Sequence, residues 1–370
     1  MFALPWTRDT VPHAVVELTR DCNLACRACY RQKTPGFRPL ADVLADVAII
    51  ENHQRVHTIS LAGGEPTLHP ELVAIVRAVK ARGHCVSLVT NGLLLTDTLL
   101  FQLAAAGLDI VMIHVDEGQV RPDLADAADI AQVNQLREAI ADRVHTHRIA
   151  VGLCTTLYPD SLDHLPDLVK LFLKHPHINF LFATHAIAIA KLVDEVQAGS
   201  VQDRPTAGTT NGKVITQLRQ QFNLEPYAFI PPTTPTADGE LPCITYSIPV
   251  AHGDPSQFFR MDSGVADRQL IKLSRLMAGR YLYFTPDRWF ANVIQVFFNG
   301  LFSGHPFRAA GFLCKAIGKP LRIKRLVFEN APRVTPEGTV NCCDFCPNST
   351  VRNGKVIPVC LADHAGKLNL

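Results

Sequence analysis

Three cysteines near the start of the chain have the spacing of a metal-cluster loop. Cys22, Cys26 and Cys29 are separated by three and two residues and directly follow an apolar, β-branched segment, 13–19. A [4Fe–4S] cluster normally takes four cysteine thiolates, so three from one short loop would leave one iron without a protein ligand. The alternative interpretation is a structural zinc loop or part of a four-thiolate electron-transfer cluster, although zinc would need a fourth ligand nearby.

Polar residues and glycines follow the next three predicted strands, where each strand ends. A Gly-Gly-Glu-Pro segment ends the second strand, Thr-Asn-Gly closes the third, and His-Val-Asp ends the fourth. The glycines let backbone approach a ligand closely, and the glutamate could receive an ammonium group. An open iron could be chelated by the amino and carboxylate groups of methionine, which S-adenosylmethionine carries. The residues concerned are Gly63, Gly64, Glu65, Asn91, His114 and Asp116.

A repeated pattern of short β-branched runs and longer helical stretches must position these residues. The predicted strands are 13–19, 58–61, 85–89, 110–115, 148–153 and 179–182. The predicted helices between them are 40–52, 70–82, 97–106, 125–143 and 162–174. Strands and helices that alternate in this way form a parallel sheet covered by helices. We therefore predict an α/β fold, an open partial (β/α)6 barrel whose ligand site lies at the carboxyl ends of the strands.

Together, the Cys-x3-Cys-x2-Cys loop, the Gly-Gly-Glu-Pro strand end and Thr-Asn-Gly resemble the radical S-adenosylmethionine (radical SAM) superfamily over residues 13–185. The resemblance implies that Cys22, Cys26 and Cys29 bind an open-site [4Fe–4S] cluster. It also implies an enzyme, either an oxidoreductase or a transferase. The cluster would cleave S-adenosylmethionine reductively to a 5′-deoxyadenosyl radical, which abstracts hydrogen from the substrate. A small electron donor such as a ferredoxin or a flavodoxin would be its partner.

The same resemblance implies which residues contact the cofactor. They are Gly63, Gly64 and Glu65 at its methionine end, and Asn91, His114 and Asp116 near its carboxylate or ribose. One position departs from the family pattern. An aromatic residue that packs near the adenine usually precedes the third cysteine, whereas here Ala28 stands there and Tyr30 follows the cysteine. This departure affects the expected adenine contacts and leaves the cluster ligands unchanged.

A second group of cysteines lies in the C-terminal tail, namely Cys342, Cys343, Cys346 and Cys360. Cys343 and Cys346 have the two-residue gap of a metal-binding knuckle, and turn signals nearby fit two small hairpins. The tail resembles the auxiliary-cluster extensions of many radical SAM proteins, although it matches none of their spacings closely. A structural zinc knuckle is the alternative, because zinc and iron–sulfur clusters both use thiolates. Whether Cys342, Cys343 or both bind the metal is left open.

The alternation of strands and helices stops after residue 184, and we predict three domains. They are the partial barrel, 1–230; a linker and aromatic-rich helical region, 231–322; and the cysteine-rich auxiliary domain, 323–370. Seven of the nineteen phenylalanines lie between Tyr281 and Leu313, with a helical pattern at 289–302. That helix would close the open side of the barrel, form the wall of an apolar substrate site, or lie on a membrane surface. The cationic run from Lys315 to Arg325 could meet anionic head groups.

The overall composition narrows the choice of partners. With 47% apolar and 19% charged residues the chain is a folded protein, and its net charge of +2 gives no indication of nucleic acid binding. The first ten residues lack the apolar run of a secretory signal, so we expect a cytoplasmic protein, peripheral at a membrane if the aromatic helix binds one. The expected substrate is apolar, with a membrane-surface lipid as the first candidate and a peptide as the alternative. A zinc or iron–sulfur scaffold or sensor is the non-enzymatic alternative.

Overall fold

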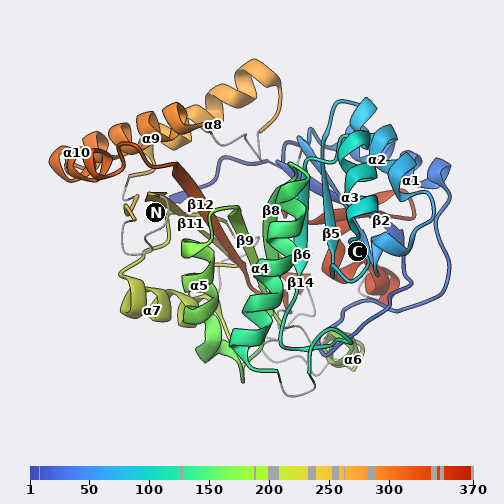
Figure 1. Cartoon of the computed structure of the whole chain (residues 1–370). Helices are drawn as coiled ribbons and strands as arrows, with labels where there is room; N and C mark the ends of the chain where they lie inside the picture. The colour runs from blue at the N-terminus through green and yellow to red at the C-terminus, as the bar shows by residue number, and fades with distance from the viewer. Residues whose placement is uncertain are drawn as a thin grey trace.

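Six parallel strands form the centre of the fold, and helices cover them (Figure 1). In sheet order the strands are β2 (His13–Thr19), β4 (Thr58–Gly63), β5 (Cys85–Thr90), β6 (Ile110–His114), β8 (Ala150–Leu157) and β9 (Ile178–His185). The helices between them are α1 (Leu40–His53), α2 (Leu72–Ala81), α3 (Asp97–Ala106), α4 (Ile130–Thr146) and α5 (Leu165–Lys174). The predicted α/β fold with a partial (β/α)6 barrel is confirmed. This computed structural model describes the chain except residues 8, 126–127, 187–188, 199–207, 232–238, 252–257, 262, 282–287, 335–339, 342–345 and 368–370.

Local capping sequences set the helix boundaries. The hydroxyl of Thr96 accepts a hydrogen bond from the backbone N–H of Leu99, and Gly107 ends the same helix with a φ of 93°, so α3 has the predicted bounds. Helix α4 begins five residues later than predicted, because Asp129 and Gln132 form a reciprocal capping box at its start.

The sheet continues beyond the six units, which the sequence pattern did not predict. Strand β12 (Leu321–Glu329) pairs in parallel with β9, and β11 (Cys243–Ala251) pairs antiparallel with β12. The short strands β10 (Ala228–Ile230) and β1 (Phe2–Ala3) complete ten strands. Strand β12 therefore belongs to the main sheet. This strand also crosses the boundary predicted at residue 323, although the division into three domains stays a prediction.

The buried position of Lys324 explains why the sequence pattern did not predict β12. It stands in a run of basic residues that we interpreted as a surface feature, yet its side chain is buried. Its ammonium group donates to three carbonyl oxygens, those of Phe172 (2.7 Å), His175 (2.6 Å) and Ile178 (2.7 Å). A buried cation is tolerated when its donors are satisfied in this way.

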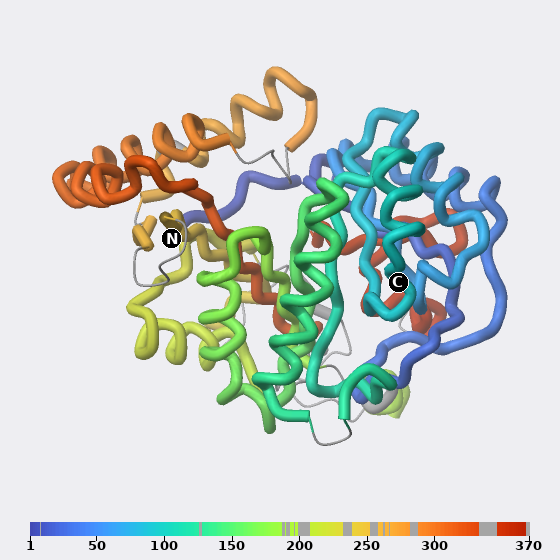
Figure 2. Tube along the Cα trace, viewed as in Figure 1, coloured from blue at the N-terminus to red at the C-terminus, as the bar shows by residue number. Residues whose placement is uncertain are grey.

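The C-terminal segment, and not the aromatic helix, packs beside the first strand. The hairpin of β15 (Ser349–Arg352) and β16 (Lys355–Pro358), followed by the 3-10 helix η3 (Val359–Lys367), lies next to β2 and α1. Figure 2 shows this red trace among the blue N-terminal units. The hydroxyl of Ser349 bonds Gln54 (3.1 Å), just after α1. The C-terminal segment thus packs against the first strand and the first helix of the barrel.

Helices α8 (Val265–Ala278), α9 (Trp289–Phe302) and α10 (Pro306–Lys315) lie together at one side of the molecule (Figure 1). The predicted helix at 289–302 is confirmed, but it packs near the amino-terminal end of β12, where Asn292 donates to the carbonyl of Leu321 (2.8 Å). No helix among the described residues is long and apolar enough to cross a bilayer. The remaining elements are β3 (Ala25–Cys26), η1 (Pro66–Leu68), β7 (Gln119–Val120), η2 (Leu162–His164), α6 (Ile189–Gln197), α7 (Asn211–Phe222), β13 (Arg333–Val334) and β14 (Val340–Asn341).

Candidate functional site

A cavity of about 280 Å³ opens at the carboxyl ends of the parallel strands. It gathers most of the residues that the sequence singled out. Those that line it are Cys22, Cys26, Cys29, Gly63, Gly64, Glu65, Asn91, His114, Cys346 and Cys360. Asp116 does not line it, and Cys342 and Cys343 lie outside the described residues.

The two glycines let the cysteine loop dock against the end of β4. The N–H of Gly64 donates to the carbonyl of Thr19, and the N–H of Glu65 to that of Asp21, both at 2.8 Å. A Cβ atom on Gly63, whose φ is 137°, would lie 2.2 Å from the Thr19 oxygen, and one on Gly64 would lie 2.0 Å from the Asp21 oxygen. Glycine is therefore required at both positions for backbone to meet backbone. The sequence pattern alone indicates only that these glycines allow close contact with a ligand.

Hydrogen bonds of Glu65, which follows β4, connect the end of that strand to the end of β5. Its buried carboxylate accepts hydrogen bonds from the N–H and hydroxyl of Thr67 (3.0 and 2.6 Å), the hydroxyl of Thr90 (2.7 Å) and the N–H of Asn91 (2.8 Å). Three of these bonds go to Oε1 and one to Oε2. Oε2 accepts only one of these hydrogen bonds, so it can accept a bond from one further donor.

Asn91 and a short strand pair hold the cysteine loop from the other side. The Asn91 amide donates to the side-chain oxygen of Asn23, which lies between the first two cysteines (2.8 Å). Strand β3, which contains Cys26, pairs antiparallel with β7, and the N–H of Arg27 donates to the carbonyl of Gly118 (2.8 Å). The loop is thus fixed to the ends of several strands before any ligand binds.

His114 and Asp116 lie side by side at the carboxyl end of β6. The Nε2 atom of His114 donates to the Asp116 carboxylate (3.0 Å), and the other oxygen of that carboxylate accepts the N–H of Gly118 (2.8 Å). Burial raises the pKa of Asp116, but its bonds from His114 and Gly118 outweigh burial and leave the pKa below its ordinary value. His114 therefore faces the cavity with Asp116 orienting it from behind.

Two of the three thiols of the loop have raised pKa values. Burial raises the pKa of Cys22, and burial together with the nearby Asp116 raises that of Cys26 to about 12. Metal binding would displace these protons, because only the thiolate is a ligand. Among the described residues, no three His, Cys, Asp or Glu side chains converge on a point that a single ion could occupy. Three thiols from one loop, lining one cavity, are a donor set that fits an open-site cluster.

Two of the C-terminal cysteines reach the same cavity. Cys346 lies 3.7 Å from the carboxylate of Glu329, which also accepts a hydrogen bond from Asn348 (2.8 Å). His13, at the start of β2, bonds the carbonyl of Pro347 (3.1 Å) and so fixes the chain next to Cys346. Cys360 follows β16. The spacing of the cysteines does not indicate that both groups face one cavity. The contacts that bring them together join residues that are far apart in the sequence.

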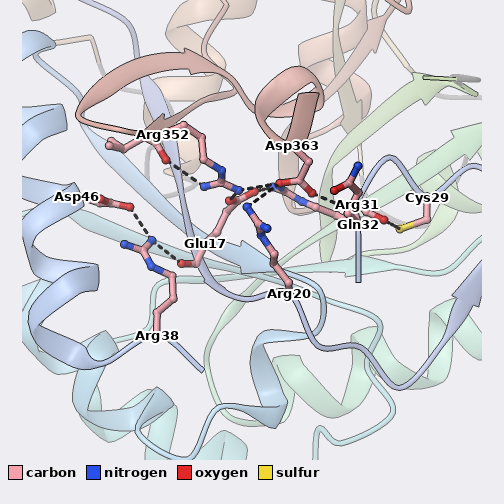
Figure 3. Close-up of polar contacts among 10 residues, drawn as sticks. Glu17, Arg20, Cys29, Arg31, Gln32, Arg38, Asp46, Arg352 and Asp363 are labelled. Atoms are coloured by element: carbon pink, nitrogen blue, oxygen red, sulfur yellow. Dashed lines mark hydrogen bonds and ion pairs between the residues drawn. The ribbon is translucent and has the colours of Figure 1, made fainter. Parts of the chain in front are cut away.

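A buried network of ion pairs ties the C-terminal segment to the cysteine loop (Figure 3). The carboxylate of Asp363 in η3 pairs with Arg20 (3.2 Å), Arg31 (3.4 Å) and Arg352 (3.2 Å). Arg31 and Arg352 also pair with Glu17 of β2. Burial raises the pKa of Asp363, but the surrounding arginines outweigh this and hold it below its ordinary value. Sequence reasoning missed all five residues.

Comparison with known proteins agrees with this combination of fold and site. Residues 16–172 match the family model described as the radical SAM superfamily. The chain is 29% identical over 170 residues to a "Tungsten-containing aldehyde ferredoxin oxidoreductase cofactor-modifying protein" of Pyrococcus furiosus, covering 43% of this chain and 47% of that protein. It is 38% identical over 104 residues to a "Probable GTP 3',8-cyclase" of Saccharolobus islandicus, covering 27% and 33%.

A third relative is a "PqqA peptide cyclase" of Xanthomonas campestris pv. campestris, 28% identical over 180 residues and covering 45% of this chain and 46% of that one. The chain thus spans less than half of the length of these relatives. Among solved structures, SuiB of Streptococcus suis bound to S-adenosylmethionine has a TM-score of 0.42 at 16% identity, covering 59% of this chain and 51% of that one. The similarity to the radical SAM superfamily thus lies at residues 16–172.

Proposed function

We propose that the protein is a radical SAM enzyme that cleaves S-adenosylmethionine reductively. The observation that carries the proposal is the cavity in which Cys22, Cys26 and Cys29 lie beside Glu65 within a radical SAM domain. When bound, the cluster and the cofactor supply a 5′-deoxyadenosyl radical that abstracts hydrogen from an unreactive C–H bond. A ferredoxin or a flavodoxin is the proposed source of the electron.

The residues of the chain bind and orient the cofactor in this proposal. The remaining lone pair of Glu65 Oε2 suits the ammonium group of the methionine moiety, which would be a charge-assisted hydrogen bond. Asn91 and His114 supply polar side chains to the same cavity. Asp116 acts by orienting His114, and Gly63 and Gly64 act by docking the cysteine loop.

An apolar substrate is favoured by part of the cavity wall. Val89, Met112, Phe180 and Phe182 line the cavity and belong to one apolar cluster. Such walls exclude water and suit a hydrocarbon group with few polar atoms. A lipid-like molecule is the proposed substrate class, which would make the protein peripheral at a membrane. The aromatic helix α9 contributes nothing to this wall, since it lies near the amino-terminal end of β12.

A peptide is the alternative substrate, because one relative is named a peptide cyclase. The C-terminal tail also enters the proposal. Cys346 and Cys360, together with Cys342 and Cys343, would bind a second iron–sulfur cluster or a zinc ion. A scaffold or sensor that binds metal without turnover remains the non-enzymatic alternative.

The first experiment tests cofactor cleavage. We expect anaerobically reconstituted protein to form 5′-deoxyadenosine from S-adenosylmethionine when dithionite is added. The Cys22→Ala/Cys26→Ala/Cys29→Ala variant should form none, while Cys314→Ala, which alters an exposed cysteine on α10, should retain the activity. Equal cleavage by the triple variant would refute the assignment of the loop, and cleavage by neither protein would favour the scaffold.

A second experiment tests the substrate class. Cells of the source organism grown in deuterated medium provide an organic-solvent lipid extract and a separate peptide fraction. Deuterium transferred into 5′-deoxyadenosine, measured by mass spectrometry, identifies the fraction that contains the substrate. Transfer from the lipid fraction alone is expected, and transfer from the peptide fraction alone would establish the alternative.

A further inference from the structure

Helix α9 presents its polar side chains to the protein and its aromatic side chains outward. Its buried stripe contains Asn292 and Asn299, which donate to the carbonyls of Leu321 (2.8 Å) and Ser263 (2.6 Å). The opposite stripe is exposed, as with Phe290 at 70%. A surface helix of a water-soluble domain normally has the reverse arrangement. The apolar stripe of α9 therefore needs an explanation other than core packing.

The exposed apolar surface extends over all three helices, and we call it the three-helix surface. Fourteen of the nineteen large apolar side chains that are exposed among the described residues lie between Val265 and Ile317. Those more than 65% exposed are Leu276, Met277, Phe290, Phe307 and Ile317. The helices pack closely against one another, since a Cβ on Gly300 of α9 would lie 2.2 Å from the Cβ of Ala309 of α10. A patch this concentrated on a folded protein marks an interaction site.

The charge around this surface is almost entirely positive. Residues 263–320 contain eight Lys or Arg and two Asp. Of the two acids, Asp267 is buried and accepts hydrogen bonds from Tyr227 and Gln295. The exposed cations include Arg268, Lys272 and Lys315. Two copies of such a surface would bring like charges together, whereas an anionic partner would be attracted.

We infer that the three-helix surface binds the face of an anionic lipid bilayer. Apolar side chains flanked by cations on helices too short to span a membrane are the composition of an interfacial anchor. The surface lies at the amino-terminal end of the parallel strands, as the contacts of Asn292 with Leu321 and of Arg280 with Gly83 indicate. The candidate active site opens at the carboxyl ends of these strands. The anchor is therefore separate from the substrate entrance and does not rest on the proposed function.

Vesicle flotation tests the inference on the reconstituted full chain. The probes are phosphatidylcholine vesicles with and without phosphatidylglycerol. We expect binding to the anionic vesicles to be stronger by about tenfold or more and to weaken as salt is added. The Phe290→Ser/Phe307→Ser variant should lose about tenfold or more of this binding. Phe101→Ser, at a phenylalanine of α3 that is 68% exposed, should bind as the wild type does.

A charge variant keeps the test independent of folding defects. Lys272→Glu/Lys315→Glu changes two exposed side chains and should abolish the preference for anionic vesicles. Lys170→Glu on α5 is the matched control and should preserve it. Absence of binding to either vesicle would overturn the inference. So would a dimer of the wild type, seen by light scattering, that Phe290→Ser/Phe307→Ser dissociates, because the surface would then belong to a second copy. Neither result bears on S-adenosylmethionine cleavage, which is measured separately.

Discussion

At the scale of single residues, the site depends on close contact between two backbones. The carbonyls of Thr19 and Asp21 lie against Gly63 and Gly64, and this contact fixes the start of the loop that carries Cys22. The contact can be formed only where no Cβ intervenes. The Gly-Gly pair therefore has a structural role that is independent of any cofactor.

Replacing Gly64 tests this role. In Gly64→Ala the new methyl would lie 2.0 Å from the backbone oxygen of Asp21, which no side-chain movement can relieve. We expect the free energy of unfolding to fall by about 1–3 kcal/mol or more, and iron binding to weaken. Gly311→Ala is the control, because its Cβ meets nothing within 4 Å on α10. That variant should gain about 0.5–1 kcal/mol in urea unfolding, and a similar loss in both would refute the explanation.

At the scale of elements, the contact between the C-terminal segment and the first strand determines what the cavity contains. The hairpin and η3 bring Cys346 and Cys360 to the loop that carries Cys29. The polar connections that hold them there include the ion pairs around Asp363 and the hydrogen bond between His13 and Pro347. Each connection can be removed separately.

The ion pairs are tested by Asp363→Asn. The variant leaves the buried Arg31 and Arg352 with the single carboxylate of Glu17, and breaking a buried pair on one side typically costs about 3–5 kcal/mol. We expect lower stability and faster proteolysis within the C-terminal hairpin. Asp160→Asn removes the exposed pair with Arg27 and should change neither measurement noticeably. Equal protection of the hairpin in both variants would show that the ion pairs of Asp363 do not hold it in place.

The hydrogen bond of His13 predicts a pH dependence. Because the carbonyl of Pro347 can only accept, Nδ1 carries the proton, and Nε2 accepts from the Ser60 hydroxyl. Burial lowers the pKa of His13 to about 4, below its value of about 6.5 in the unfolded chain. The unfolded state therefore binds the proton first. Stability should be complete above pH 6.5 and fall by about 3 kcal/mol as the pH drops to 4.

Urea unfolding at several pH values measures this effect. His13→Gln keeps a donor for Pro347 and an acceptor for Ser60 but does not titrate, so its stability should fall less steeply between pH 6.5 and 4. An identical slope in both proteins would assign the pH dependence to other histidines, such as His185, whose pKa burial also lowers to about 4.

At the scale of the whole molecule, one cavity receives cysteines from both ends of the chain. If the tail binds a second cluster, iron per chain should fall to about half in Cys346→Ala/Cys360→Ala, by analogy with a four-thiolate site. Metal analysis and electron paramagnetic resonance check this. One zinc per chain, lost in the same variant, would instead indicate a structural knuckle.

Local signals in the sequence were sufficient to predict the strands and helices of the barrel and the polar residues at the carboxyl ends of its strands. Thr96 and Gly107 mark the two ends of α3, and polar residues at the ends of the predicted strands, such as Glu65 and His114, line the cavity. The sequence could not reveal features that depend on distant contacts. In the sequence, Lys324 cannot be distinguished from a surface lysine, because the three carbonyl groups that accept its hydrogen bonds lie far from it along the chain. In the sequence, Asp363 cannot be distinguished from a surface carboxylate, because the arginines that pair with it come from other segments of the chain.

The contact between His13 and Pro347 joins residues 334 positions apart, and this separation has a consequence for synthesis. A ribosome adding about 5–20 residues per second needs about 15–70 s to pass from one to the other. During that interval the cysteine loop has left the ribosome while the segment that completes its cavity has yet to be made. Contacts of such long range also form late in folding. The cavity is therefore complete only after the C-terminal segment has been made and has packed against the first strand.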